Sequence, residues 1–375
     1  MLEMGFRPAI TQMLRMLPPK QTRQTMLYSA TMPKDITSMA DFALNRPFNT
    51  VDTVGADTDT HARVPQFCIT HPLADTYEEL FSVIHNAMKV PDFKVICFFV
   101  TARLTQLASE LFVLMGFPVL EIHSRKSQSH RTKVSAKFRD GSKLIMFTSD
   151  VSARGLDYPD ITTVVQVGLP TDKAQYVHRL GRTARAGKNG RGVLLLGDFE
   201  ARKFSASIRD QNVKKLTSCR QQDPALFEQA HTRKVEALRK MSPKSMGMGY
   251  QAWLGFYNSS LRKLGWKQAD LVRHATIFAC QACNLAETPS LQARTVGKMG
   301  LKGVPGLRVE GRNGVPRRDD SGNGRGGRGG RGNQGNQGNR GFNNRGRGGG
   351  GGGGGGGRGR GGGNQRNGNG RNNGM

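Results

Sequence analysis

The segment that decides the fold reads Tyr176-Val-His-Arg-Leu-Gly-Arg-Thr-Ala-Arg185 and lies within a longer stretch, residues 144–187. Helical periodicity places His178, Arg182 and Arg185 on one face of a helix. Two guanidinium groups on one face repel each other, whereas a dense anion such as a phosphate suits their planar, permanently charged forks. A basic helix taken alone is also typical of a solvated surface, so the preceding residues decide between these interpretations.

Two apolar runs precede this helix. Residues 143–148 predict a buried strand that leads into Ser149-Asp-Val-Ser-Ala-Arg-Gly-Leu-Asp157. Residues 162–167 predict the next strand, and the turn Gly168-Leu-Pro170 follows it. Ligands of open α/β sheets bind at the carboxyl ends of the strands. The Ser, Asp, Arg and Gly residues found there indicate phosphate and ribose binding.

Short apolar runs alternate with amphipathic stretches from residue 64 onward, which is the pattern of a parallel sheet covered by helices. The expected strands are 66–70, 94–100, 117–122 and 192–196, and the expected helices are 77–88, 101–114 and 199–209. We therefore predict an α/β fold.

These motifs resemble the second RecA-like domain of DEAD-box RNA helicases. The segment 149–157 is similar to that family's motif V, and 178–185 is similar to its motif VI, in the same order. The resemblance implies ATP-dependent RNA helicase or RNA chaperone activity, with Arg182 and Arg185 as the catalytic arginines that reach the γ-phosphate of ATP. It implies that Asp157 binds the ATP ribose and that His178 couples two RecA-like domains.

The resemblance also implies a set of RNA contacts. Ser149, which keeps the hydroxyl of the family's usual Thr, would bind an RNA phosphate, and Gly155 lies in the same motif. Thr101-Ala-Arg103 resembles motif IV, in which Thr101 caps a helix and Arg103 either contacts RNA or is a solvated first-turn residue.

A further RNA contact is predicted after the strand 117–122. Gln128 and Arg131 match the family pattern, and the start of their helix would form an anion site. Without the resemblance, this segment is a basic helix cap. Ser124 stands where the wider family has glycine, which argues against close backbone approach to RNA at that position.

Residues 1–45 resemble the end of a first RecA-like domain. A helix is expected at 6–17, a strand at 25–29 and a second helix at 33–44, and Ser29, Ala30 and Thr31 match motif III, which couples the two domains. The sequence has no glycine-rich phosphate loop and no Asp-Glu pair of a DEAD box. We therefore expect a fragment, or a gene model begun at an internal methionine. The resemblance implies ATP and Mg²⁺ as cofactors, yet the chain alone should bind RNA without hydrolysing ATP.

Composition points to a polyanionic partner and to a reducing compartment. The net charge is +28 and the pI is about 10.6, which favours RNA and a salt-dependent affinity. Five scattered cysteines form no disulfide framework. Cys280-Gln-Ala-Cys283 has the spacing of a zinc site, but no second pair follows, so packing on a helix and no metal site are expected. No apolar run is long enough to cross a membrane.

The remaining chain is predicted to form four regions. Residues 46–65 form a linker, 66–210 the second RecA-like domain, 211–310 a basic helical extension, and 311–375 a disordered tail. The extension should contain helices at 224–240, 250–264 and 268–284, with Trp253, Phe256 and Tyr257 in its core. It either widens the RNA surface, as the resemblance implies, or only stabilises the domain.

The tail is rich in arginine and glycine. Residues 321–375 contain ten arginines, no lysine and no acidic residue, a composition typical of segments that bind single-stranded nucleic acid. We expect single-stranded RNA and short duplexes as partners, and other RNA-bound proteins through the tail. A non-catalytic RNA-binding or RNA-annealing protein is the alternative function.

Two segments bear on the subgroup and the compartment. His123-Ser-Arg-Lys-Ser-Gln128 and residues 296–308 resemble the plant and fungal organellar subgroup of DEAD-box proteins, which includes mitochondrial splicing RNA chaperones. A mitochondrial or other organellar location is therefore expected, with nucleus or cytoplasm as alternatives.

Overall fold

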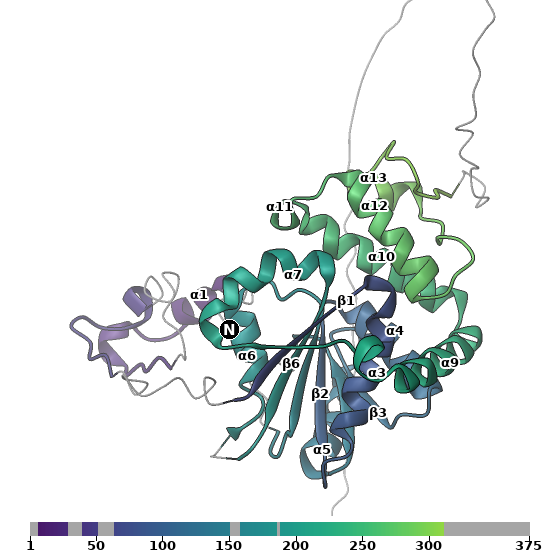
Figure 1. The fold of residues 1–375 in the computed structure, drawn as a ribbon. Helices are drawn as coiled ribbons and strands as arrows, with labels where there is room; N and C mark the ends of the chain where they lie inside the picture. Colours follow the sequence, from purple (N-terminus) through teal and green to yellow (C-terminus); the bar gives the residue numbers. More distant parts are fainter. Residues whose placement is uncertain (1–6, 29–39, 52–63, 151–157, 186–187, 311–375) are drawn as a thin grey trace, which may run out of the picture. The chain divides into compact units, whose positions relative to one another are not determined.

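The computed structural model describes residues 7–28, 40–51, 64–150, 158–185 and 188–310. Its centre is a parallel seven-stranded sheet with the strand order β3-β4-β2-β5-β6-β1-β7 (Figure 1). The strands are β1 (Gln66–His71), β2 (Lys94–Phe99), β3 (Val119–Ile122), β4 (Leu144–Thr148), β5 (Thr163–Val167), β6 (Arg191–Gly197) and β7 (Lys214–Leu216). The predicted parallel α/β sheet is confirmed, and the expected strands from 66 to 196 differ from the observed ones by at most two residues at an end.

Strand β7 was not predicted. All three of its residues are exposed, and it pairs only with β1 at the edge of the sheet. Two of the three residues are lysines, so no apolar run marks it. Charged edge strands of this kind are common because they discourage pairing with other chains.

Alternation along β2 shows how helices cover the two faces of the sheet. Val95, Cys97 and Phe99 belong to the larger core cluster, whereas Ile96 and Phe98 belong to a second cluster on the other face. The helices α3 (Thr76–Ala87) and α4 (Ala102–Leu114) cover the first face, and α5 (Gln128–Asp140) covers the second. Helix α6 (Lys173–Leu180) contacts both clusters, because Tyr176 and Leu180 belong to the larger one and the Arg179 guanidinium lies over the Phe98 ring of the second. Helix α7 (Asp198–Phe204) and the 3₁₀ segment η6 (Ser205–Gln211) follow β6.

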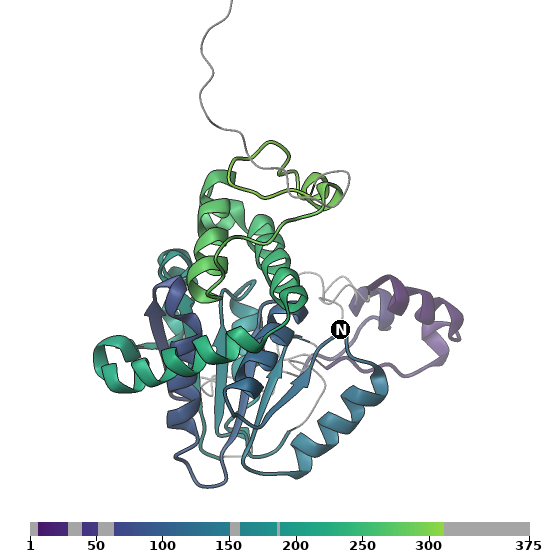
Figure 2. The ribbon, with the colours of Figure 1, turned by 90° about the vertical axis from the view of Figure 1, so that its right-hand side faces the viewer.

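The extension after β7 is helical, as predicted (Figure 2). Its elements are α8 (Cys219–Gln222), α9 (Pro224–Lys240), α10 (Pro243–Ser259), α11 (Leu261–Leu264), α12 (Gln268–Ile277), the π-helical turn η7 (Phe278–Ala282) and α13 (Ala293–Lys298). The predicted helix 224–240 is confirmed. The predicted helix 250–264 begins seven residues earlier, where Ser242 caps it and Pro243 occupies its first turn, and it breaks at Ser260.

Apolar packing joins α10 to α4. The two helices approach most closely at Gly249, where an added Cβ would lie 2.6 Å from Leu107 Cδ2. Trp253 and Tyr257 are each 3% exposed. The prediction that these aromatic residues form core is therefore confirmed, and Phe256 packs against the same cluster.

Carboxylates at the start of α3 hold the beginning of the extension. Asp75, in the 3₁₀ turn η3 (Leu73–Asp75), accepts two hydrogen bonds from the Arg220 guanidinium, at 2.7 and 2.8 Å. Glu79 accepts the backbone N–H of Cys219 at 2.8 Å. Both carboxylates are buried. The bond to the Cys219 N–H is therefore shielded from water and strengthened, whereas Arg220 itself is exposed.

A third carboxylate of α3 holds helix α9. Glu78 Oε1 accepts from His231 Nδ1 at 2.9 Å and forms an ion pair with Lys234. Glu78 and Lys234 are each 1% exposed. Removal of the Lys234 charge would leave the buried Glu78 carboxylate with His231 alone, and removal of the Glu78 charge would leave Lys234 buried without it, which is costly in either case.

The first described segments contain the helix α1 (Arg7–Met16) and the 3₁₀ turn η2 (Lys20–Thr22). The helix predicted at 6–17 is confirmed, and residues 40–43 of the helix predicted at 33–44 are helical. The predicted strand 25–29 is wrong for its described part, because Thr25–Tyr28 is neither helical nor paired. A strand needs neighbours for its backbone hydrogen bonds, and Tyr28 is 88% exposed.

Candidate functional site

The carboxyl end of β4 carries the first predicted site residues. Thr148 is fully buried and donates to the Ser149 carbonyl at 2.9 Å, while Ser149 is 8% exposed and Asp150 is partly exposed. Gly155 and Asp157 lie outside the described residues, as do Ser29, Ala30 and Thr31. The roles predicted for these five residues stay predictions.

Helix α6 follows the end of β5. It begins where Asp172 Oδ1 accepts the Gln175 N–H at 2.7 Å. It ends at Leu180, because Gly181 caps it and its N–H closes the last turn to the Val177 carbonyl at 2.8 Å.

The single helix predicted over 176–185 is therefore wrong. Beyond Gly181 the backbone forms tighter turns, and Ala184 has the left-handed φ of 54°. The Thr183 hydroxyl donates to the Ile161 carbonyl and holds this turn against the residues that precede β5. His178 thus lies on α6, while Arg182 and Arg185 lie on the turn after it.

The arginine turn, residues 181–185, keeps both predicted catalytic side chains partly buried. Arg185 Nε donates to the Gly181 carbonyl at 2.9 Å, which folds its side chain back over the end of α6. A glycine cap, rather than a continuous helix face, sets the directions of Arg182 and Arg185. Two guanidinium groups three residues apart in one tight turn still make a compact donor group for phosphate oxygens.

Sequence reasoning missed the ion pair that fixes α6. Arg179 is 1% exposed, and its Nε and Nη2 both lie 2.8 Å from Asp150 Oδ1. Gln175 Nε2 donates to Asp150 Oδ2 at 3.0 Å, and the Arg179 guanidinium lies 5.5 Å from the centre of the Phe98 ring. Burial lowers the pKa of Arg179, and the Asp150 carboxylate opposes that shift. The signal in the sequence was an arginine that directly precedes the apolar Leu180 on a helix.

The residues predicted to bind RNA begin at the end of β2. Thr101 caps α4 by accepting the Leu104 N–H at 3.2 Å, which confirms its predicted role. Arg103 is partly exposed and donates to Gln106 Oε1 at 2.7 Å. Desolvation and then the charge of Arg125 lower the pKa of Arg103. Two positive groups that influence each other at a surface are suited to a shared anion.

The end of β3 supplies the other predicted contacts. Ser127 caps α5 by accepting the His130 N–H at 3.2 Å. Gln128 and Arg131 lie in its first turn and are hydrogen-bonded to each other. Since β4 lies between β3 and β2 in the sheet, the three strand ends bring Arg103, Arg131 and Ser149 to one edge.

These groups fit a nucleotide phosphate better than a metal ion. Guanidinium and hydroxyl groups are phosphate donors, and the arginine turn supplies two of them. Among the described residues, no three His, Cys, Asp or Glu side chains come together in a way that could hold a metal. Within that same part of the chain, no helix is long and apolar enough to span a membrane.

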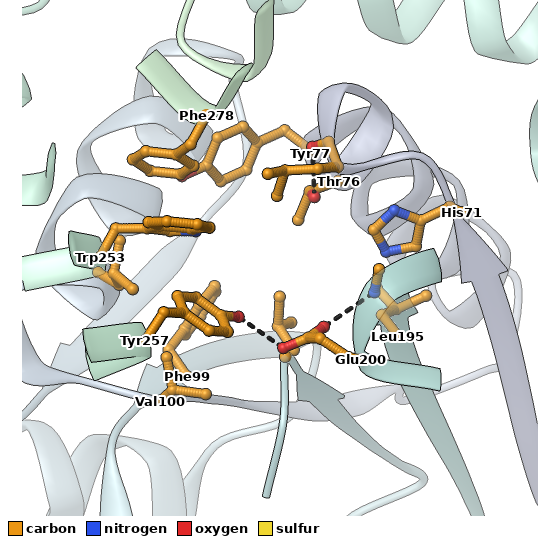
Figure 3. A pocket seen from close by; sticks show the side chains of 15 residues that line it. His71, Thr76, Tyr77, Phe99, Val100, Leu195, Glu200, Trp253, Tyr257 and Phe278 are labelled. Atoms are coloured by element: carbon orange, nitrogen blue, oxygen red, sulfur yellow. Dashed lines mark hydrogen bonds between the residues drawn. The ribbon is translucent and has the colours of Figure 1, made fainter. Parts of the chain in front are cut away.

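The extension closes the rest of the same sheet edge (Figure 3). A cavity of about 50 Å³ lies between the ends of β1, β2, β5 and β6 and the aromatic residues Trp253, Tyr257 and Phe278. His71 is 2% exposed, and its Nδ1 lies 2.9 Å from the Pro72 carbonyl, so its Nε2 is an acceptor in the neutral ring and has no hydrogen-bond partner among the described residues. The cavity is large enough for a few water molecules, which are suitable donors to this nitrogen.

Comparison with known proteins agrees with this geometry. Residues 75–187 match the family described as "Helicase conserved C-terminal domain". The RecA-like sheet and this match define the chain as one that carries the C-terminal domain of a helicase.

The relatives give the particular family. "DEAD-box ATP-dependent RNA helicase 25" of Oryza sativa subsp. japonica is 41% identical over 310 residues, which cover 82% of this chain and 50% of the relative. "DEAD-box ATP-dependent RNA helicase 31" of Arabidopsis thaliana is 40% identical over 83% of this chain and 42% of the relative. The chain belongs to the DEAD-box RNA helicase family, and it spans about half the length of the curated relatives it matches.

Solved structures share the fold. Mss116p bound to ssRNA and AMP-PNP matches with a TM-score of 0.65 and 22% identity, over 80% of this chain and 61% of that one. The second domain of Mss116p, bound to an RNA duplex, matches with a TM-score of 0.55 and 23% identity, over 64% of this chain and 96% of that one.

Proposed function

We propose that this chain is the second RecA-like half of an ATP-dependent RNA helicase. The arginine turn is the observation that carries the proposal, because an ion pair between the buried Arg179 and the partly exposed Asp150 fixes α6 immediately before it. The hydroxyl and basic groups predicted to bind RNA follow the carboxyl ends of β4, β2 and β3, whereas the Thr183 hydroxyl holds the arginine turn against Ile161, which precedes β5. The domain thus presents donors for two phosphate-containing ligands at two places.

Arg182 and Arg185 serve the ATP side of this proposal. ATP supplies the phosphoryl group, and a partner RecA-like domain holds most of it together with Mg²⁺. The two guanidinium groups donate to its terminal phosphate and neutralise charge as the bond to that phosphate breaks. Arginines used in this way contribute on the order of 1,000- to 100,000-fold to phosphoryl transfer. His178 transmits domain contact, and Asp157 accepts from the ribose.

Ser149, Arg103 and the Gln128–Arg131 pair serve the RNA side. A hydroxyl group and two guanidinium groups at neighbouring strand ends favour consecutive phosphates of one strand. Phosphate contacts carry no base information, so we expect binding of single strands and short duplexes with little sequence preference. The chaperone role, the organellar location and protein partners of the tail belong to this proposal too.

A fusion protein tests the enzymatic claim. The 375-residue chain is joined to the first RecA-like domain of a rice relative, and ATP hydrolysis is measured with and without RNA. The fusion should show RNA-stimulated turnover, whereas the chain alone should bind RNA without turnover. Arg182→Ala should reduce kcat at least 1,000-fold. Arg202→Ala, an exposed arginine of α7, should leave kcat unchanged.

The alternative function predicts a different outcome. A non-catalytic RNA-annealing protein would act through its basic extension and tail, and its annealing rate would not depend on ATP, Arg182 or Arg185. Equal annealing by the wild type and by Arg182→Ala, together with no turnover in the fusion, would favour this alternative. Appreciable turnover by the chain alone would contradict both functions.

A further inference from the structure

Hydrogen bonds connect the extension with the turn that precedes α6. Tyr257 of α10 donates to Glu200 Oε1 at 2.5 Å (Figure 3), and the same oxygen accepts the Leu169 N–H at 2.7 Å. Glu200 Oε2 accepts the Gly197 N–H at 2.8 Å. Glu200 is 2% exposed. This buried carboxylate therefore links α10, the start of α7 and the turn after β5.

A second side chain of the extension holds the same turn. Lys263 of α11 donates to the Pro170 carbonyl at 2.9 Å and to the Thr171 carbonyl at 2.8 Å. The turn has little freedom of its own, because Gly168 has a φ of 84° and an added Cβ would lie 3.1 Å from Val100 Cγ1. Residues 168–171 are thus fixed from both sides.

The turn passes directly into α6. Thr171 donates its N–H to Gln175 Oε1 at 2.8 Å, and Asp172 caps the helix. Gln175 and Arg179 then reach Asp150 at the end of β4. A continuous chain of hydrogen bonds therefore leads from the extension to the helix that positions the arginine turn.

We infer that Tyr257 and Lys263 are positioning residues, which set the placement of α6 and of the arginine turn through residues 168–172. Each side chain restricts the conformation of this turn. Tyr257 orients the carboxylate that accepts from Leu169, and Lys263 fixes two neighbouring carbonyl groups. The consequence for ATP hydrolysis rests on the proposed function, whereas the placement of α6 does not. The extension acts here on the ATP side of the domain, in addition to any surface it offers to RNA.

Hydrogen exchange of the full 375-residue chain tests this inference without ATP or RNA. Tyr257→Phe removes only the hydroxyl, and Lys263→Met removes both bonds to the turn while it keeps the apolar stem. Each should accelerate amide exchange in α6 about 2- to 10-fold relative to the amides of β2, as expected for the loss of one or two hydrogen bonds. Tyr250→Phe and Lys244→Met, both on α10 and away from the turn, are the matched controls.

The relative rates separate positioning from plain stabilisation. A merely structural role would accelerate exchange in α6 and β2 by the same factor, and that result would overturn the inference. In the fusion protein, Tyr257→Phe should lower kcat several-fold and leave the KM for RNA unchanged. Faster exchange in α6 with an unchanged kcat would overturn the link to turnover. A fusion without any activity would contradict the proposed function alone, since the exchange experiment would still decide the inference.

Discussion

The carboxyl edge of the sheet has two halves that differ in chemistry. The open half, at the ends of β3 and β4 and beside β2, carries the partly exposed guanidinium groups of Arg103 and Arg131. The closed half, at the ends of β1, β6 and β5 and at Phe99 of β2, is covered by Trp253, Tyr257 and Phe278 of the extension. Strand geometry is the same in both halves. The residue that follows each strand, together with what packs on it, decides whether the edge binds a ligand or an additional subdomain.

The closed half is not simply apolar. Charged groups such as Glu78, Lys234 and Glu200 lie in the contacts of the extension, and each is at least 98% buried. Such groups are costly to bury unless they are paired. We therefore expect changes in the closed half to alter stability, and changes in the open half to alter ligand binding or turnover.

The largest stability effect is expected from the ion pair between α3 and α9. Lys234→Met leaves the buried Glu78 carboxylate without its cation, so the free energy of unfolding should fall by about 3–5 kcal/mol. Urea unfolding measures this loss, and Lys240→Met, an exposed lysine of the same helix, is the control. A loss below 1 kcal/mol would show that the pair does not fasten the extension.

A pH-dependent effect is expected from Glu200. Burial raises the pKa of this carboxyl from 4.5 to about 7, although Tyr257 and two backbone N–H groups oppose the shift. The folded state therefore binds a proton more tightly than the unfolded state, and this contribution to stability is lost as the pH rises from about 4.5 to 7. The loss amounts to about 3 kcal/mol.

Glu200→Gln should remove this dependence. The difference in unfolding free energy between the wild type and the variant should change by about 3 kcal/mol between pH 4.5 and 7.5. Urea unfolding across this range measures it, and Glu236→Gln on α9 is the control. A constant difference across the range would mean that Glu200 titrates at its ordinary pKa.

A smaller effect on the free energy of unfolding is expected from the ion pair between Arg179 of α6 and Asp150 at the end of β4. Arg179→Met keeps the apolar stem against Phe98 but loses the bonds to Asp150, which is partly exposed and remains solvated. We expect a loss of about 1–3 kcal/mol. Asp150→Asn combined with Arg179→Met should cost less than the sum of the single changes, as for residues in contact. Additive costs would contradict a direct pair.

The smallest effects are expected for RNA affinity. Arg103→Ala and Arg131→Ala should each weaken binding only a few-fold, because the tail and extension also attract RNA. Each should reduce the magnitude of the negative slope of log K against log salt by about one unit. Filter binding at several salt concentrations measures the slope. Arg139→Ala, at the other end of α5, should leave it unchanged, and equal slopes for all three variants would place the RNA elsewhere.

Much of the fold was predictable because apolar runs mark buried strands. β2 and β5 are buried at every residue, and both were predicted to within one residue at each end. β7 was missed because its stability comes from pairing with β1 rather than from burial of its own side chains. The strand predicted at 25–29 has an apolar pattern but no observed partner, and sequence periodicity does not encode the presence of neighbours.

The sequence predicted which residue types form the site, but not how they are arranged. The residue types at the ends of β4 and α6 indicated phosphate chemistry. Helical periodicity, however, predicted a helix that continues beyond Gly181, whereas the glycine cap ends it there. The pair Arg179–Asp150 joins residues 29 positions apart, and no local pattern reveals such a contact. The acidic start of α3 likewise pairs with Arg220 and Lys234, which lie far along the chain, so no local pattern predicts these contacts.

One paired measurement tests most directly whether the arginine turn serves turnover while the closed half serves stability. ATP turnover and thermal midpoint are measured together for the fusion protein with Arg182→Lys in the arginine turn or Lys234→Met in the closed half. The account predicts that Arg182→Lys lowers kcat by orders of magnitude with little change in the midpoint. Lys234→Met should lower the thermal midpoint, and its kcat should equal that of the wild type at temperatures well below that midpoint. A fall in the midpoint with unchanged kcat for Arg182→Lys would contradict the account, because that arginine would then be a structural residue.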